Sequence, residues 1–194
     1  GRSLERAQQI RDRILPNHPD LAATLKERAK LHVIGGDFEA ARTLIDRAER
    51  IFQENGGASD PELADCLLVR GNLLQETGNL SEAQDAYERA LAMLERSLPP
   101  DRPELASALQ SLAGVRGETG DFARAKSLFE RAITIKSKAY GPDDAEVALA
   151  RVGYARVLRA TADFGRARDE NERALKALER ALGSDHLLVA EPLI

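Results

Sequence analysis

The chain has 194 residues, of which 31% are charged and 4% aromatic, and its formal net charge is -4. Basic and acidic residues are interspersed, so the charge does not indicate a general nucleic-acid binder. No apolar run reaches the roughly 18 residues of a membrane-spanning helix, and a single cysteine, Cys66, excludes an internal disulfide framework. Leucine and alanine dominate the apolar residues and favour helices. We expect a soluble, cytoplasmic, all-α protein, and the excess of arginine over lysine suggests a bacterial source.

The expected elements alternate between shorter and longer helices, beginning inside a helix at residues 1–16. One phrase returns after each turn: GDFEAARTLIDRAERIF at 36–52, GNLSEAQDAYERALAML at 78–94, GDFARAKSLFERAITIK at 120–136 and ADFGRARDENERALKAL at 162–178. Successive phrases begin 42 residues apart, at Gly36, Gly78, Gly120 and Ala162. An unbroken step indicates stacked repeats, because one helical hairpin exposes more apolar surface than it can bury alone.

The repeat divides the chain into one continuous solenoid domain. Its expected parts are 1–16 (second helix of a preceding partial repeat), 17–58, 59–100, 101–142 and 143–183 (four repeats), and 184–194 (start of a further repeat).

The first helix of each repeat, helix A, is expected to begin at a polar cap residue and to carry an acid three residues later, as in a capping box. The caps would be Asn17, Ser59, Asp101, Asp143 and Asp185, and the acids Asp20, Glu62, Glu104 and Glu146. Leucine, leucine and a small residue then recur four apart, as at Leu21, Leu25 and Ala29. This spacing predicts a buried stripe.

The second helix, helix B, is expected to follow a left-handed glycine turn and to be capped by the next Asp or Asn. Each B helix has two alanines seven residues apart: Ala41 and Ala48, Ala83 and Ala90, Ala125 and Ala132, Ala167 and Ala174. These put a small residue where a neighbouring helix comes close. The acid-Arg pairs that follow, such as Asp46-Arg47 and Glu130-Arg131, are interpreted as an exposed face with modest ion pairs.

These residues resemble a known family. Small residues at Gly71, Ala83 and Ala90, large ones at Leu67, Leu74 and Tyr87, and the Gly78-Asn79 turn are similar to the tetratricopeptide repeat. The 42-residue step, the PELA entry and the long second helix resemble its kinesin-light-chain-type variety over residues 17–194. The resemblance implies a right-handed α-solenoid of stacked antiparallel hairpins, with helix B longer than helix A.

The last repeat departs from this pattern at two positions. Asn171 stands where Ile45, Tyr87 and Phe129 are bulky, and Arg151 stands where Leu25, Leu67 and Leu109 are apolar. We expect this repeat either to pack less tightly or to use these positions for contacts.

No residues have the spacing of a catalytic or metal site. His18, His32 and His186 have no cysteine or carboxylate at ligand spacing, and His18 and His186 are expected at helix caps. Cys66 is expected to be a small buried residue of a helix. We therefore expect no enzyme activity, no metal and no cofactor.

In the family that the sequence resembles, the A helices line a concave groove. The positions one step away from the buried stripe would face this groove: Lys26, Lys30, Val33, Leu68, Asn72, Gln75, Gln110, Gly114, Gly117, Val152, Arg156 and Arg159. The groove would have basic ends and a neutral middle with room for a backbone, which suits an extended acidic segment. Alternatively, these positions are simply solvated.

Two classes of function remain. The first is a non-catalytic scaffold or sensor module of a larger protein that binds an extended peptide or a partner helix in the groove. The alternative is a nucleic-acid or nucleotide-sensing repeat array that regulates an attached effector domain. That function needs basic residues interleaved with stacking aromatics, and the groove positions include no aromatic. We favour the first class, expect no membrane contact, and note that the solenoid ends could self-associate.

Overall fold

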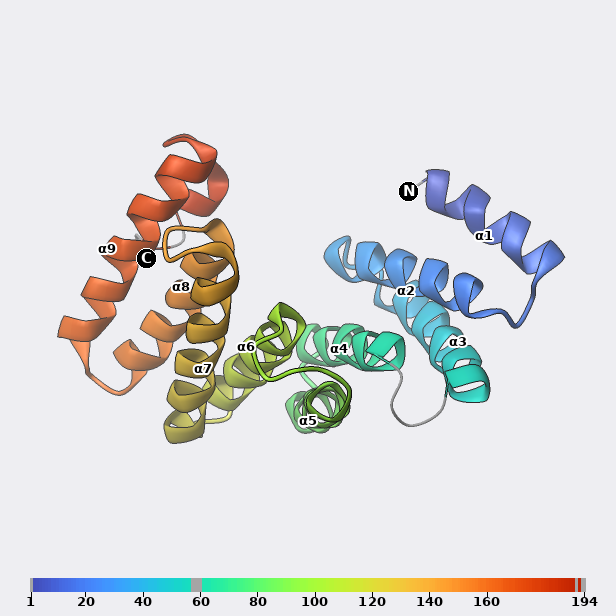
Figure 1. The fold of residues 1–194 in the computed structure, drawn as a ribbon, viewed down its shortest axis with the longest axis horizontal. Coiled ribbons are helices and arrows are strands. Elements are labelled where there is room, and N and C mark those ends of the chain that lie inside the picture. Colours follow the sequence, from blue (N-terminus) through green and yellow to red (C-terminus); the bar gives the residue numbers. More distant parts are fainter. Residues whose placement is uncertain (1, 57–60, 191, 193–194) are drawn as a thin grey trace. The chain divides into compact units, whose positions relative to one another are not determined.

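The computed structural model describes residues 2–56, 61–190 and 192, and nearly all of these are helical (Figure 1). The elements in this described part are α1 (Arg2–Ile14), α2 (Pro19–Ile34), α3 (Phe38–Gly56), α4 (Pro61–Glu76), α5 (Leu80–Ser97), α6 (Pro103–Glu118), α7 (Phe122–Tyr140), α8 (Ala145–Ala160), α9 (Phe164–Leu182) and the short 3₁₀ turn η2 (Leu187–Val189). It contains no strand, so the all-α prediction is confirmed. None of these helices is both long and apolar enough to cross a membrane.

The chain divides into two compact units, residues 1–98 and 99–194. In each unit, A helices of 16 residues alternate with B helices of 18 or 19 residues, as predicted. Each A helix packs against the B helix that follows it. In the first unit α3 also packs on α4, and in the second α7 packs on α8, so hairpins stack within each unit. The prediction of one continuous domain, with the boundaries given above, stays a prediction.

The core of each hairpin consists of the residues that the repeat predicts. The A-helix stripe is buried, with Leu21, Leu25 and Ala29 at 0% exposure, and its counterparts in α4 and α6 are buried too. The paired alanines of all the B helices are also buried. Alanine at these positions lets the helix backbones approach closely, so the repeated small residues set the spacing of the hairpins.

The prediction for the A-helix caps was wrong by one residue. α2 begins at Pro19, and its cap is His18, whose ring Nδ1 accepts a hydrogen bond from the Asp20 amide at 3.2 Å. α8 is capped by Asp144, whose carboxylate accepts from the Glu146 amide at 2.8 Å. In α2 and α6 a proline occupies the first helical position and keeps the residue before it extended, as a cap residue must be, so it fixes the cap there. α8 begins at Ala145 without a proline, and its cap is set by the side-chain hydrogen bond of Asp144.

The other A-helix caps are shifted in the same way. Arg102 occupies the cap position of α6 without a side-chain hydrogen bond, and His186 caps η2. None of the predicted residues Asn17, Asp101, Asp143 and Asp185 caps a helix, and Ser59 lies outside the described residues. The first-turn acids consequently stand at the second helical position instead of the third. At the helix starts that the structure describes, those of α2, α6 and α8, no capping box forms. Two of the four acids, Glu62 and Glu146, have another role described below.

The B-helix turns agree with the prediction. Gly36, Gly78 and Gly120 have positive φ angles of 75°, 79° and 85°, and Ala162 at the same register has a φ of 58°. Asp121 and Asp163 then cap α7 and α9 by accepting backbone N–H groups. Asn79 occupies the cap position of α5, but its side chain makes no cap hydrogen bond, so the predicted side-chain cap is missing there.

Replacing Ala162 by Gly should therefore stabilise the second unit by about 0.5–1 kcal/mol. An L-residue in the left-handed region costs roughly 1–2 kcal/mol, and the greater freedom of glycine in the unfolded chain offsets part of this gain. Chemical denaturation measures the change, and Gly120→Ala is the matched control with the opposite expected sign. A loss of stability in Ala162→Gly would show that the Ala162 methyl group makes a contact worth more than the strain.

The ends of the described chain are consistent with the repeat pattern. α1 packs on α2, although its assignment to a preceding repeat stays a prediction. Of the predicted further helix at 184–194, the structure has the turn η2, in which Val189 is buried and Leu187 is exposed. Residues Glu191, Leu193 and Ile194 lie outside the described residues.

Candidate functional site

The predicted groove positions of the first unit lie on α2 and α4, and we call them the first-unit A face. This face consists of Lys26, Lys30, Val33, Leu68, Asn72 and Gln75. Asn72 is exposed, and Lys30, Val33, Leu68 and Gln75 are half-buried. Lys26 differs from the prediction, because it is only 5% exposed.

Lys26 is buried in a cluster of carboxylates. Its Nζ lies 2.5 Å from Oδ2 of Asp65 and 2.8 Å from Oε2 of Glu62, both on α4. Lys30 Nζ shares Asp65 at 3.1 Å and also lies 3.0 Å from Glu27. Both ammonium groups are therefore engaged within the protein, and this end of the face is not the basic cluster that the sequence predicted.

The ionisation of this cluster follows from its contacts. Burial would lower the pKa of Lys26, but its hydrogen bonds to Asp65 and Glu62 outweigh burial and raise that pKa. Burial likewise opposes ionisation of Asp65, yet the hydrogen bond from Lys26 and the charges of Lys26 and Lys30 lower the pKa of Asp65. Lys26 and Asp65 therefore stay charged at neutral pH, and the two lysines lie against the carboxylate side chains of Glu27, Glu62 and Asp65.

Tyr87 of α5 donates its hydroxyl group to the side chains of Asn72 and Gln75. The Tyr87 hydroxyl lies 2.7 Å from Oδ1 of Asn72 and 2.9 Å from Oε1 of Gln75, while the rest of the Tyr87 side chain is fully buried. The ring reaches this position over Gly71, where an added Cβ would lie 2.3 Å from the ring carbon Cε1. Tyr87, a residue of a B helix, therefore holds the two amide side chains of this A face in position.

The remaining predicted positions lie on α6 and α8, and we call them the second-unit A face. This face consists of Gln110, Gly114, Gly117, Val152, Arg156 and Arg159. An added Cβ at Gly114 would meet nothing within 4 Å, whereas at Gly117 it would lie 3.0 Å from Val157. Arg156 and Arg159 are exposed, and Val152 is buried. There is thus open space beside the backbone at Gly114, whereas a side chain at Gly117 would contact Val157.

A second buried ammonium joins α6 to α8. Lys136 of α7 is 3% exposed, and its Nζ lies 2.8 Å from both Oε1 of Gln110 and Oε2 of Glu146. Glu146 has the same register position as Glu62, and Gln110 that of Lys26. In both units a buried lysine thus binds the first-turn acid of the second A helix, but one lysine comes from an A helix and the other from a B helix. Sequence reasoning missed Lys136, because only this B helix has a lysine at that position.

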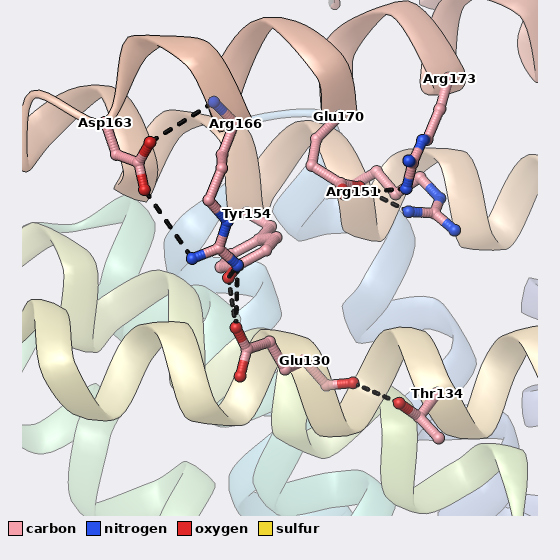
Figure 2. Close-up of polar contacts among 8 residues, drawn as sticks. All are labelled: Glu130, Thr134, Arg151, Tyr154, Asp163, Arg166, Glu170 and Arg173. Carbon is pink, nitrogen blue, oxygen red and sulfur yellow. Dashed lines mark hydrogen bonds and ion pairs between the residues drawn. The ribbon is translucent and has the colours of Figure 1, made fainter.

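The acidic residues of the acid-Arg pairs also contact side chains of the next helix. Asp46 of α3 lies 2.5 Å from Arg70 of α4, which also contacts Glu49 at 2.7 Å. At the matching position of the second unit, Glu130 of α7 accepts a hydrogen bond from the Tyr154 hydroxyl of α8 (Figure 2). These acids therefore link a B helix to the next A helix, which the interpretation as an exposed face did not include.

Arg166 of α9 completes this cluster. Its Nη2 donates to the Tyr154 hydroxyl at 2.6 Å and to Glu130 at 3.2 Å, and its guanidinium lies 5.6 Å from the centre of the Tyr154 ring (Figure 2). Burial, followed by the hydrogen bond to Glu130, raises the pKa of Tyr154 to about 12. The cluster joins α7, α8 and α9 and is a structural link, because its polar groups face one another.

The departure at Arg151 has a partner that sequence reasoning missed. Arg151 Nη1 lies 2.5 Å from Oε2 of Glu170 on α9, and the two side chains are 14% and 15% exposed (Figure 2). Glu170 stands at the register of Leu44, Ala86 and Leu128. Two apolar positions have thus been replaced together by opposite charges, and this joint change was the signal in the sequence.

The other departure, Asn171, lies at a pocket of about 360 Å³. Phe164, Ala167, Leu175 and Pro192 also line this pocket, and Phe164 is 67% exposed. At the same register, Phe129 of α7 packs against Gly153 of α8. The smaller Asn171 and the exposed Phe164 agree with the looser packing expected for this repeat. Self-association through the solenoid ends stays a prediction.

No catalytic centre emerges from the part of the chain that the structure describes. It has no group of three or more His, Cys, Asp or Glu side chains able to hold a metal ion. Cys66 is buried in α4, as expected, and burial raises the pKa of its thiol, which disfavours the reactive thiolate.

The comparisons with known proteins agree with this geometry. The family model of the tetratricopeptide repeat matches residues 29–96, 63–138 and 104–180. No curated protein matches the sequence.

Solved structures show the same fold. BtubC (BKLC) from P. vanneervenii is similar with a TM-score of 0.78 and 24% identity, over 96% of this chain and 73% of that one. A Podosopora anserina protein described as a putative kinesin light chain with nearly identical TPR-like repeats is similar in two crystal structures, with TM-scores of 0.72 for a variant form and 0.69 for the other. Both forms have 19% identity over 92% of this chain and 84% or 85% of theirs. Because the family model matches residues 29–180 without a gap in three overlapping copies, which is more than half of the chain, the chain belongs to the tetratricopeptide repeat family.

Proposed function

We propose that this chain is a protein-interaction scaffold that binds extended peptide segments on the A faces of its two units. Tetratricopeptide repeats generally mediate protein–protein interaction and are typically non-catalytic. We place this role in a regulatory module of a larger, cytoplasmic bacterial protein, a setting supported by the free Cys66 and the arginine-rich composition.

One observation carries the proposal: the repeat keeps its core but varies its A faces. The buried stripe has leucine or a small residue at each matching position of the first three repeats, whereas the register of Lys30, Asn72, Gly114 and Arg156 has an ammonium, an amide, no side chain and a guanidinium. Packing does not require this variety, because these positions are exposed or half-buried. A rigid frame with chemically different outward groups is suited to reading the sequence of a bound segment.

The two A faces have different charge preferences. In the second unit Arg156 is exposed and has no ion pair within the described residues, so this face suits an acidic side chain close to the open space at Gly114. In the first unit both lysines are already neutralised by carboxylates. The acidic partner expected from the sequence therefore applies, in this proposal, to the second unit alone.

Blocking the A faces tests the proposal. Peptides selected from a phage-displayed random dodecapeptide library on the immobilised chain should lose binding at least about tenfold in Gly114→Phe or in Asn72→Trp, because the new ring occupies the space of the peptide. Gly114→Phe is informative because its Cβ meets nothing within 4 Å, so the ring is accommodated without displacing core atoms.

Matched controls place the same rings on the exposed surface of B helices. Ala92→Trp on α5 and Ala123→Phe on α7 should leave the dissociation constants unchanged. Circular dichroism and thermal melts of all four variants confirm folding. If the control rings weaken binding and the A-face rings do not, the partner uses the B helices and the proposal is wrong.

A further inference from the structure

The first-unit A face has a feature that none of the other hairpins shares. Position 87 of α5 is tyrosine, and the matching residues are Ile45, Phe129 and Asn171. Position 71 of α4 is glycine, and the matching residues are Ala29, Ala113 and Ala155. Gly71 and Tyr87 therefore form a matched pair within one hairpin.

The pair fits together sterically. An added Cβ at Gly71 would lie 2.3, 2.5 and 2.7 Å from three ring carbons of Tyr87, so only glycine leaves room for the ring. Glycine inside a helix costs about 1 kcal/mol relative to alanine. Filling the core does not require this cost, since alanine and isoleucine occupy the same two positions in the first hairpin. What the pair adds is a hydroxyl group on the inner side of α4.

That hydroxyl orients the amide of Asn72. It donates to Oδ1 of Asn72 at 2.7 Å, the nearer of its two carbonyl acceptors. Because Oδ1 is held toward the protein, the Nδ2 group of Asn72 faces away from Tyr87, and it has no partner within the described residues. An amide nitrogen with two fixed N–H donors on an exposed helix position suits a carbonyl oxygen of an extended peptide backbone.

The charges around Asn72 specify the side chains of such a peptide. Lys26 and Lys30 both pair with carboxylates of the protein itself, so neither ammonium group is left for a peptide. Glu76, one turn beyond Asn72 on α4, is exposed and makes no ion pair in the described part of the chain. An acidic peptide would meet the Glu76 carboxylate here, whereas a lysine or arginine side chain would complement it.

We propose that Tyr87 is a positioning residue that fixes Asn72 as a main-chain donor, and that the first-unit A face takes an extended segment carrying lysine or arginine. This inference rests on the proposed function and specifies the partner of one of its two faces. Orienting the amide in advance removes an ordering cost from binding, so the hydroxyl contributes to affinity without touching the peptide.

The experiment uses peptides selected on the full chain from a phage-displayed random dodecapeptide library, with affinities measured by fluorescence anisotropy. Peptides whose binding is lost in Asn72→Trp should be enriched in lysine and arginine. Asn72→Asp, which keeps an acceptor for Tyr87 but removes the donors, should weaken them about tenfold or more, and Tyr87→Phe about three- to tenfold. Tyr140→Phe on α7 is the matched loss of a hydroxyl and should change nothing.

A readout without peptide separates positioning from packing. Tyr87→Phe keeps the ring over Gly71, so the thermal midpoint should change little. The side-chain amide resonances of Asn72 in a ¹⁵N-edited NMR spectrum should shift in Tyr87→Phe and stay in place in Tyr140→Phe. If these resonances do not move, or if Tyr87→Phe binds as tightly as the parent chain, Tyr87 has no positioning role.

The remaining outcomes distinguish this inference from the proposed function. Selected peptides rich in Asp and Glu that depend on Asn72 would contradict the basic partner but leave an A-face scaffold. Peptides that respond to Gly114→Phe and never to changes at Asn72 would show that the first-unit A face is unused, and this inference would fail alone. Peptides insensitive to both faces would overturn the inference and the proposed function together.

Discussion

Replacing Arg151 by Leu should lower the free energy of unfolding by about 2–4 kcal/mol, although leucine is the residue of the other repeats at this register. The reason is Glu170, whose carboxylate is 15% exposed and lies 2.5 Å from Arg151. Breaking a buried pair costs roughly 3–5 kcal/mol because one charge is left without compensation. Arg173, at 3.4 Å from Glu170, remains as a weaker exposed partner and reduces this loss.

The double variant Arg151→Leu/Glu170→Leu should recover most or all of this stability. It restores the residues of the third repeat, Leu109 and Leu128, and apolar replacements of buried ion pairs are often neutral or stabilising. Urea denaturation of the parent, both single variants and the double variant gives the coupling energy. Arg168→Leu is the control, because its pair with Glu172 is exposed at 3.8 Å and should contribute less than about 0.5 kcal/mol. A double variant as unstable as Arg151→Leu would mean that the apolar pair does not fit this hairpin.

The fold could be predicted from the sequence because the same pattern of buried residues recurs in each repeat. The stripe Leu21, Leu25 and Ala29 and the alanine pair Ala41 and Ala48 recur in register, so one interpretation is checked several times along the same chain. All these positions are buried as expected. The one systematic error, the cap residue, placed each cap one position too early in the chain. In α2 and α6 the proline at the first helical position decides for the residue directly before it. In α8, which has no such proline, the choice between Asp143 and Asp144 depends on which carboxylate reaches the first-turn amide.

The chemistry of the A faces was harder to predict, since it depends on contacts between hairpins. Lys26 looked like a solvated cation on its own helix, and its partners Glu62 and Asp65 come from α4. Only the stacked register brings these charges together. The Arg151–Glu170 pair was readable in principle, because both positions leave the apolar pattern with opposite charges in one repeat. The departure at Arg151 indicates an ion pair only when it is compared with Glu170, which lies 19 residues further along the chain.

Replacing Gly71 by Ala should have the second large effect, a loss of about 1–3 kcal/mol, despite the higher helix propensity of alanine. The new Cβ would lie 2.3 Å from Cε1 of Tyr87, and neither a fully buried ring nor a helix backbone can move away cheaply. Gly114→Ala is the matched control on α6, where the Cβ meets nothing within 4 Å. It should stabilise the chain by up to about 1 kcal/mol.

A compensating change separates the steric clash from any general sensitivity of α4. Gly71→Ala/Tyr87→Ile copies Ala29 and Ile45 of the first hairpin and should regain most of the stability lost in Gly71→Ala. The double variant would nevertheless lack the hydroxyl that holds Asn72, so its fold and its peptide affinity should separate: thermal melts near those of the parent chain, and binding as weak as in Tyr87→Phe. Recovery of affinity together with stability would show that glycine and tyrosine at these two positions serve packing alone.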